Sequence, residues 1–160
     1  MRLLILAIGK LRTRPEQQLA LDYMERSMKL GRALGLSSLR LIEIQESRAA
    51  SESERRREEA GRLIDKLPPR SFAIVLDERG KELTSEAFAG QLRRLIDGSV
   101  SDLAFLIGGA DGHGPQVASR ADLQLSLGKM TWPHRLVRPM FTEQIYRAVT
   151  ILTNHPYHRA

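Results

Sequence analysis

Short apolar runs alternate with longer amphipathic segments along this chain. The runs are typical of strands covered on both faces, because each is brief and mostly apolar. They span residues 3–8, 39–44, 72–76, 103–107 and 123–127. Strict alternation of strand and helix predicts an α/β fold with a mostly parallel sheet layered by helices, in which ligands bind outside the carboxyl ends of the strands.

The first two helices are predicted by their terminal residues. One begins at Pro15 and ends at Gly35, which can adopt the left-handed conformation that terminates helices. The next begins at Ser51, which forms a capping-box pattern with Glu54, and its charged run 54–59 is predicted to be a solvated face. The residues expected to be buried are Leu19, Tyr23, Leu30 and Leu34 in the first helix, and Leu63 and Ile64 in the second.

Two further helices are predicted by capping residues and a one-sided apolar repeat. Thr84 or Ser85 caps the third helix, which ends at Gly98, and Pro139 begins the last one. The apolar faces comprise Phe88, Leu92, Leu95 and Ile96 in the third helix, and Phe141, Ile145, Val149 and Leu152 in the last.

Composition narrows the class of protein. With 160 residues and 42% hydrophobic content, the chain can bury one core, so we expect a single domain over residues 1–160. The absence of cysteine excludes disulfides, thiolate catalysis and zinc sites built on cysteine. No apolar run approaches the roughly 20 residues of a membrane helix, so we expect a soluble, cytoplasmic protein without membrane contact.

The net charge of +6 favours a polyanionic partner such as nucleic acid. Part of the excess is concentrated near the C-terminal end, where Glu143 is the one acidic residue after position 128. The basic residues of that stretch are Lys129, Arg135, Arg138, Arg147 and Arg159.

A glycine-rich segment follows the fourth predicted strand, at residues 105–114 (FLIGGADGHG). It contains no G-x-G-x-x-G pattern, and its P-loop spacing is followed by Pro115 instead of lysine, so neither a dinucleotide site nor an NTPase is supported. Two interpretations stay open: the glycines bring backbone close to a ligand, or they only make a tight turn.

Two segments near the C-terminus combine basic and aromatic residues. In 127–138, Trp132 and Met130 either contact single-stranded RNA or plug the core. In the tail NHPYHR, residues 154–159, the side chains can bind phosphate, stack on a base and move protons, or belong to a solvated end. Two histidines without neighbouring acids make a poor metal site, so we expect no metal.

Taken together, these motifs resemble the ribosomal RNA large-subunit methyltransferase H family of the SPOUT superfamily over essentially the whole chain. The marks are LLILAIGK at 3–10, VLD at 75–77 with Gly80 and Lys81, FLIGG at 105–109 with Gly112, KMTWPH at 129–134, EQIYRA at 143–148 and YHR at 157–159. The resemblance implies a C-terminal trefoil knot, a homodimer, and S-adenosylmethionine as the cofactor. The implied cofactor contacts are Leu76, Gly108, Leu127, Gly128, Lys129, Met130, Thr131 and Trp132.

The implied substrate is N3 of the pseudouridine at position 1915 of 23S ribosomal RNA in the large subunit. We expect His158 to accept or relay its proton, Arg159 to stabilise the anion and Tyr157 to position the tail or the base. Lys129, Arg135 and Arg138 would then hold phosphate or sugar. Two alternatives remain: methylation of a different nucleotide, or a noncatalytic ribosome-binding module.

Overall fold

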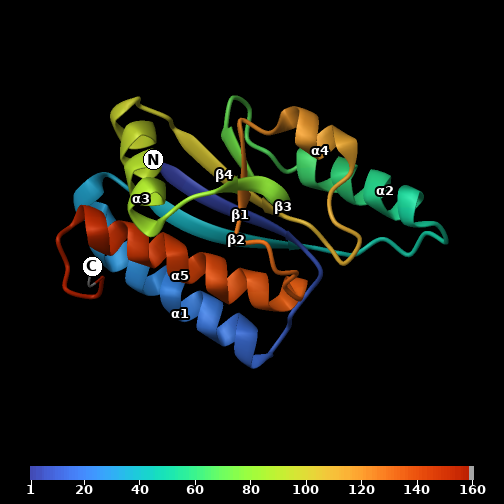
Figure 1. Cartoon of the computed structure of the whole chain (residues 1–160), viewed down its shortest axis with the longest axis horizontal. Helices are drawn as coiled ribbons and strands as arrows, with labels where there is room; N and C mark the ends of the chain where they lie inside the picture. The colour runs from blue at the N-terminus through green and yellow to red at the C-terminus, as the bar shows by residue number, and fades with distance from the viewer. Residues whose placement is uncertain (159–160) are drawn as a thin grey trace.

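The computed structural model describes residues 1–158 and contains one parallel β-sheet with helices on both faces (Figure 1). The sheet order is β2-β1-β4-β3-β5. The strands are β1 (Arg2–Ile8), β2 (Ser38–Ile44), β3 (Phe72–Glu82), β4 (Asp102–Ile107) and β5 (Leu123–Ser126). The helices are α1 (Pro15–Gly31), η1 (Arg32–Leu34), α2 (Glu52–Ile64), α3 (Ser85–Asp97), α4 (Pro115–Arg120) and α5 (His134–Leu152). The predicted α/β class is confirmed, while the trefoil knot and the single-domain assignment stay predictions.

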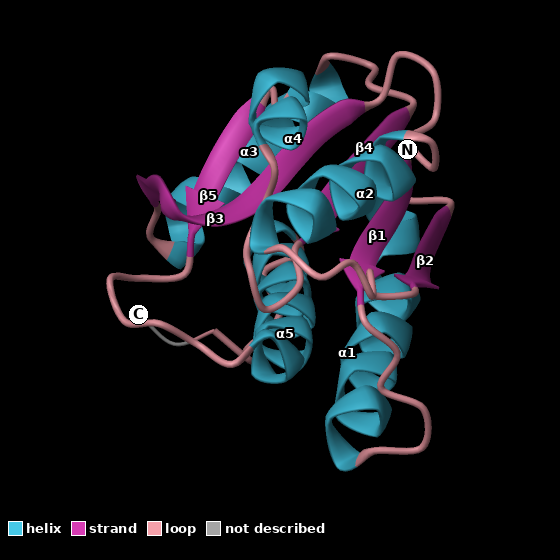
Figure 2. Cartoon of the chain, turned by 90° about the vertical axis from the view of Figure 1, so that its right-hand side faces the viewer, coloured by secondary structure: helices cyan, strands magenta, loops and turns pink. Residues whose placement is uncertain are grey.

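Two hydrophobic clusters lie on opposite faces of the sheet, because successive strand side chains point to opposite sides. Leu3 and Ile5 of β1 join α1, α3 and α5 in one cluster, whereas Leu6 and Ile8 join α2 and α4 in the other. In Figure 2, α2 and α4 lie in front of the sheet, and α1 and α5 belong to its other face. The sheet is therefore buried on both faces, as its apolar strands predicted.

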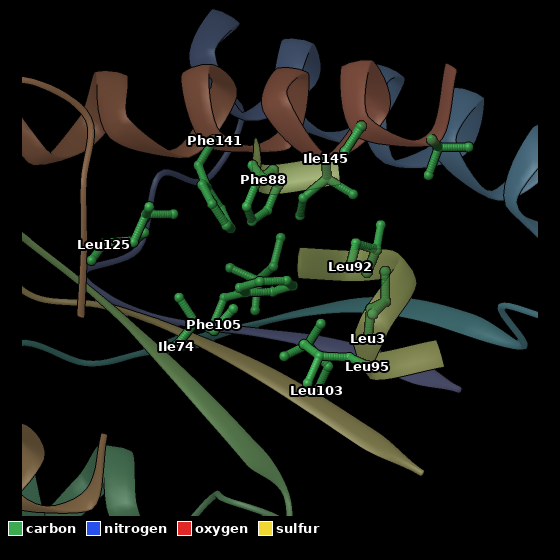
Figure 3. Close-up of a cluster of buried hydrophobic side chains, with 14 of the residues drawn as sticks. Leu3, Ile74, Phe88, Leu92, Leu95, Leu103, Phe105, Leu125, Phe141 and Ile145 are labelled. Carbon is green, nitrogen blue, oxygen red and sulfur yellow. The ribbon is translucent and has the colours of Figure 1, made fainter. Parts of the chain in front are cut away.

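Aromatic packing fixes α5 against the sheet. The ring of Phe141 lies 4.8 Å from that of Phe105 on β4 and 6.0 Å from that of Phe88 on α3, measured between centroids (Figure 3). Such offset and edge-on pairs add about 0.5–1.5 kcal/mol each beyond the burial of their area. This contact sets where the first turn of α5 lies relative to the strand ends.

Most of the predicted helix ends are confirmed. Ser51 accepts a hydrogen bond from the Glu54 amide at 3.2 Å, and Thr84 caps α3 by accepting one from the Ala87 amide at 3.1 Å. Gly35 ends the α1–η1 segment with φ of +84°.

Two helix predictions were wrong. α1 buries Ala20 and Met24, whereas Leu19 is 47% exposed. α5 begins at His134 and contains Pro139, because Pro133 serves as its N-cap residue and accepts the amide of Leu136 at 2.8 Å. With prolines at both positions, sequence alone pointed to the wrong one.

Candidate functional site

A hollow of about 370 Å³ lies at the carboxyl edge of the sheet, within the range of roughly 300–1,000 Å³ typical of small-molecule sites. Its lining comes from residues 76–79 of β3, where the pairing of β3 with β4 ends, from the ends of β4 and β5 with the segments that follow them, and from the start of α5. This is the place where ligands bind in parallel sheets.

Seven of the eight predicted cofactor contacts meet around this hollow: Leu76, Gly108, Leu127, Gly128, Met130, Thr131 and Trp132. Lys129 is not among its lining residues. Met130 and Trp132 are 72% and 39% exposed, so the interpretation that they plug the core was wrong.

Backbone conformation leaves room for a ligand at two of the glycines. Gly112 and Gly128 have φ of +78° and +110°, and nothing lies within 4 Å of the point where a Cβ would stand. Gly112 also donates its amide to the Gly109 carbonyl at 3.1 Å, which closes the loop into a tight turn. The interpretation as a tight turn is therefore confirmed, and the approach of this backbone to a ligand stays a prediction.

His113 ties the glycine loop to β3. Its Nε2 lies 3.0 Å from the Leu76 carbonyl oxygen, and its Nδ1 is buried with no hydrogen-bond partner among the described residues. Burial lowers the pKa of His113 below its ordinary value of 6.5 and favours the neutral ring. A neutral ring bonded in this way carries its proton on Nε2, because the carbonyl oxygen is an acceptor.

Two arginines of α2 hold the same loop from the other side. Arg55 Nε donates to the Asp111 carboxylate at 2.6 Å, and Arg56 Nε donates to the Asp111 carbonyl at 2.6 Å. The hydrogen bond from Arg55 lowers the pKa of Asp111. The prediction of a solvated face therefore holds for Glu54, Arg57 and Glu58, which are exposed, and was wrong for Arg55 and Arg56. Glu59 is buried as well, where it accepts the Ser47 amide at 2.8 Å.

Arg138 is a correction to the predicted RNA contacts. It is 1% exposed, and it donates to the Ile8 carbonyl at 2.7 Å, to the Gly9 carbonyl, and to Glu43 at 2.5 Å. A guanidinium that is buried against these partners cannot reach RNA. Arg135, one turn earlier, is exposed.

The tail is packed against the protein and is not a featureless end. The Tyr157 hydroxyl donates to Glu143 at 3.0 Å, and the Tyr157 ring lies 5.0 Å from the Arg147 guanidinium. His158 Nε2 is 2.8 Å from Glu86 at the start of α3. The predicted Arg159 lies outside the described residues.

The tail lies away from the hollow of its own chain. Its anchors, Glu143 and Arg147, are about 14 and 20 Å further along α5 than His134, at 1.5 Å per residue, and His134 lines the hollow. Neither Tyr157 nor His158 lines it. The structure thus brings the predicted cofactor segments together and places the predicted catalytic tail elsewhere.

A family model described as Predicted SPOUT methyltransferase matches residues 1–158. The chain belongs to the SPOUT methyltransferase family. A ribosomal RNA large subunit methyltransferase H from Sinorhizobium fredii (strain NBRC 101917 / NGR234) is 54% identical over 100% of both chains, and so is one from Rhizobium meliloti (strain 1021). A solved probable methylase family protein from Haemophilus influenzae Rd KW20 aligns with 99% of this chain and 70% of its own, at 12% identity and a TM-score of 0.48.

Sequence reasoning missed the side chains that hold the glycine loop in place beside the hollow. His113, Arg55 and Asp111 hold the glycine loop through contacts between positions at least 37 apart in the chain. The run of three consecutive arginines in α2, residues 55–57, was the available signal in the sequence. No helix among residues 1–158 is long and apolar enough to cross a membrane.

Proposed function

We propose that this SPOUT methyltransferase transfers the methyl group of S-adenosylmethionine to N3 of a pseudouridine in large-subunit ribosomal RNA. The observation that carries the proposal is the convergence of three strand-end segments on one hollow, in a chain 54% identical to large-subunit methyltransferase H proteins. A ribosomal substrate implies a cytoplasmic location.

The hollow suits a cofactor held mainly by backbone groups. Open space beside Gly112 and Gly128 lets the ligand approach the main chain, and the exposed ring of Trp132 offers an apolar surface at the rim. Leu76, Gly108 and the segment 127–132 would hold S-adenosylmethionine, which supplies an electrophilic methyl group when bound. Because backbone groups would make most of these contacts, the orientation of the cofactor depends on the loop being rigid.

The chemistry requires a proton to leave N3, because the imide lone pair is delocalised until the nitrogen is deprotonated. We assign proton capture or relay to His158, stabilisation of the anion to Arg159 and positioning to Tyr157. Arg135 and Lys129 would hold RNA phosphate or sugar. In the described structure Glu86 is in reach of His158 and can orient its ring.

A homodimer would bring this tail to a cofactor site. A second, mainly apolar hollow of about 780 Å³ lies between α1 and α5, on the other side of segment 125–128 from the first. Leu19 and Leu136 line it and are 47% and 40% exposed, which is unusual for clustered large apolar side chains unless a partner covers them. We therefore propose that the tail of one subunit serves the cofactor site of the other.

The test is incubation with labelled S-adenosylmethionine and pseudouridine-containing large subunits, followed by digestion and identification of the methylated base. Label on N3 of pseudouridine supports the proposal, and label on another base establishes the alternative substrate. A chain that binds ribosomes but shows no S-adenosylmethionine binding by calorimetry is the noncatalytic module instead.

A further inference from the structure

The loop between β1 and α1 carries three cations in five positions: Lys10, Arg12 and Arg14. All three side chains are exposed. Among residues 1–158, no acidic side chain forms an ion pair with any of them. We call residues 10–14 the basic loop.

Helix stability does not explain these cations. They precede the N-terminus of α1, where the helix dipole disfavours positive charge. Arg14 is the N-cap residue and makes no side-chain cap hydrogen bond, although serine, threonine, aspartate and asparagine are preferred there. Glu16 is the one acidic residue in the first turn of α1. These three charges therefore do not stabilise α1.

The basic loop is held at its root by buried Arg138. That guanidinium bonds the carbonyls of Ile8 and Gly9 and the carboxylate of Glu43, which in turn accepts the Leu11 amide at 2.8 Å. Leu11 is 2% exposed and so pins the loop to the core. These contacts therefore hold the backbone that carries the three exposed cations.

This root touches the candidate cofactor site. Ile8 Cγ2 lies 3.0 Å from the point where a Cβ on Gly109 would stand, and Gly109 lines the hollow. Residues 10–14 directly follow Gly9 in the chain. Three residues span at most about 10 Å, so Arg12 lies no further than that from Gly9. The loop descends beside the start of α5, which carries exposed Arg135 (Figure 1).

We propose that the basic loop binds phosphates of the RNA strand that flanks the methylated nucleotide, with Arg138 as the positioning residue. The proposal rests on the proposed function and extends its RNA surface from Arg135 to the β1 side of the hollow. Phosphate contacts fix the register of a nucleic acid without reading its sequence, so the loop aligns the substrate strand while other groups select the base.

The test is a triple variant, Lys10→Gln, Arg12→Gln and Arg14→Gln, compared with the wild type for binding to large-subunit RNA across salt concentrations. Loss of two or three phosphate contacts lowers the slope of log affinity against log salt by roughly 1.4 to 2.7, at about 0.7–0.9 per contact. Affinity for S-adenosylmethionine, measured by calorimetry, stays unchanged, and the KM for ribosomes rises while kcat at saturation is retained.

The matched control removes the same charge elsewhere, through Arg40→Gln, Lys66→Gln and Arg70→Gln. These side chains are also exposed, and they lie away from the hollow. An equal loss of salt slope in both triple variants, or an unchanged slope in the loop variant, overturns the proposal. If the wild type methylates another RNA, the proposed function fails while the same comparison on that RNA still tests the loop.

Discussion

At the scale of single residues, the site depends on polar side chains that the protein buries for positioning. His113 is the clearest case, because its ring joins the glycine loop to the Leu76 carbonyl within the protein interior. Arg138 does the same for the root of the basic loop. Each is a group whose removal leaves buried partners unsatisfied, which is more costly than the loss of an exposed contact.

The first prediction concerns His113 and pH. Its folded pKa is lowered by burial, so the unfolded state binds more protons as pH falls below the ordinary value of 6.5. The stability contributed by the neutral ring is full above that pH and is lost as pH falls toward the folded pKa. Urea denaturation from pH 7.5 to 5.5 should show this decline, and His113→Gln should make it shallower. His134, whose pKa burial also lowers, accounts for part of the remaining slope.

The second prediction concerns Arg138. Arg138→Met removes the cation that pairs with Glu43 and the donor that two buried carbonyls share, so the free energy of unfolding should fall by about 3–5 kcal/mol. Arg135→Met is the control, because that side chain is exposed and its loss should change stability by less than about 0.5 kcal/mol. Equal effects of the two substitutions in urea denaturation would show that the buried contacts of Arg138 do not stabilise the fold.

At the scale of elements, most features that depend on neighbouring residues were predicted correctly from the sequence, whereas contacts between distant segments were not. Strand runs and the caps at Ser51 and Thr84 depend on neighbouring residues, so periodicity and spacing predicted them. The start of α5 is an exception among the local signals, because Pro133 and Pro139 both suit the beginning of a helix and only the structure shows that Pro133 is the N-cap residue. Likewise, the resemblance named residues on the three strand-end segments, but it gave no sign that α2 holds the glycine loop.

The third prediction tests that role of α2. Asp111→Ala removes both oxygens that Arg55 binds, so the glycine loop should lose rigidity and affinity for S-adenosylmethionine should fall roughly tenfold, as about 1.4 kcal/mol implies. Ser51→Ala weakens the same helix at its cap, by about 1 kcal/mol, without touching the loop. Calorimetry should therefore show weaker binding for the first variant and unchanged binding for the second. Weaker binding in both would assign the effect to helix stability alone.

At the scale of the whole molecule, the two halves of the candidate site lie apart in one chain. The cofactor segments meet at the carboxyl edge of the sheet, whereas Tyr157 and His158 are docked on α5 and α3. Sequence could not show this separation, because it follows from the length and direction of α5. In a homodimer whose interface covers Leu19 and Leu136, the tail of one subunit can reach the cofactor segments of the other, and the two halves of the site then meet.

The last prediction decides between a tail acting in its own chain and one acting in a partner. One variant ends at residue 156 and keeps its cofactor segments; the other carries Gly128→Val, which fills the open space in the hollow and should abolish S-adenosylmethionine binding. Each alone should be inactive. After mixing, denaturation and refolding, half of the dimers are mixed, and each mixed dimer has one complete site if tails cross, so activity should return to about a quarter of the wild-type value. A tail that serves its own chain gives no recovery, because no mixed dimer then contains both parts on one polypeptide.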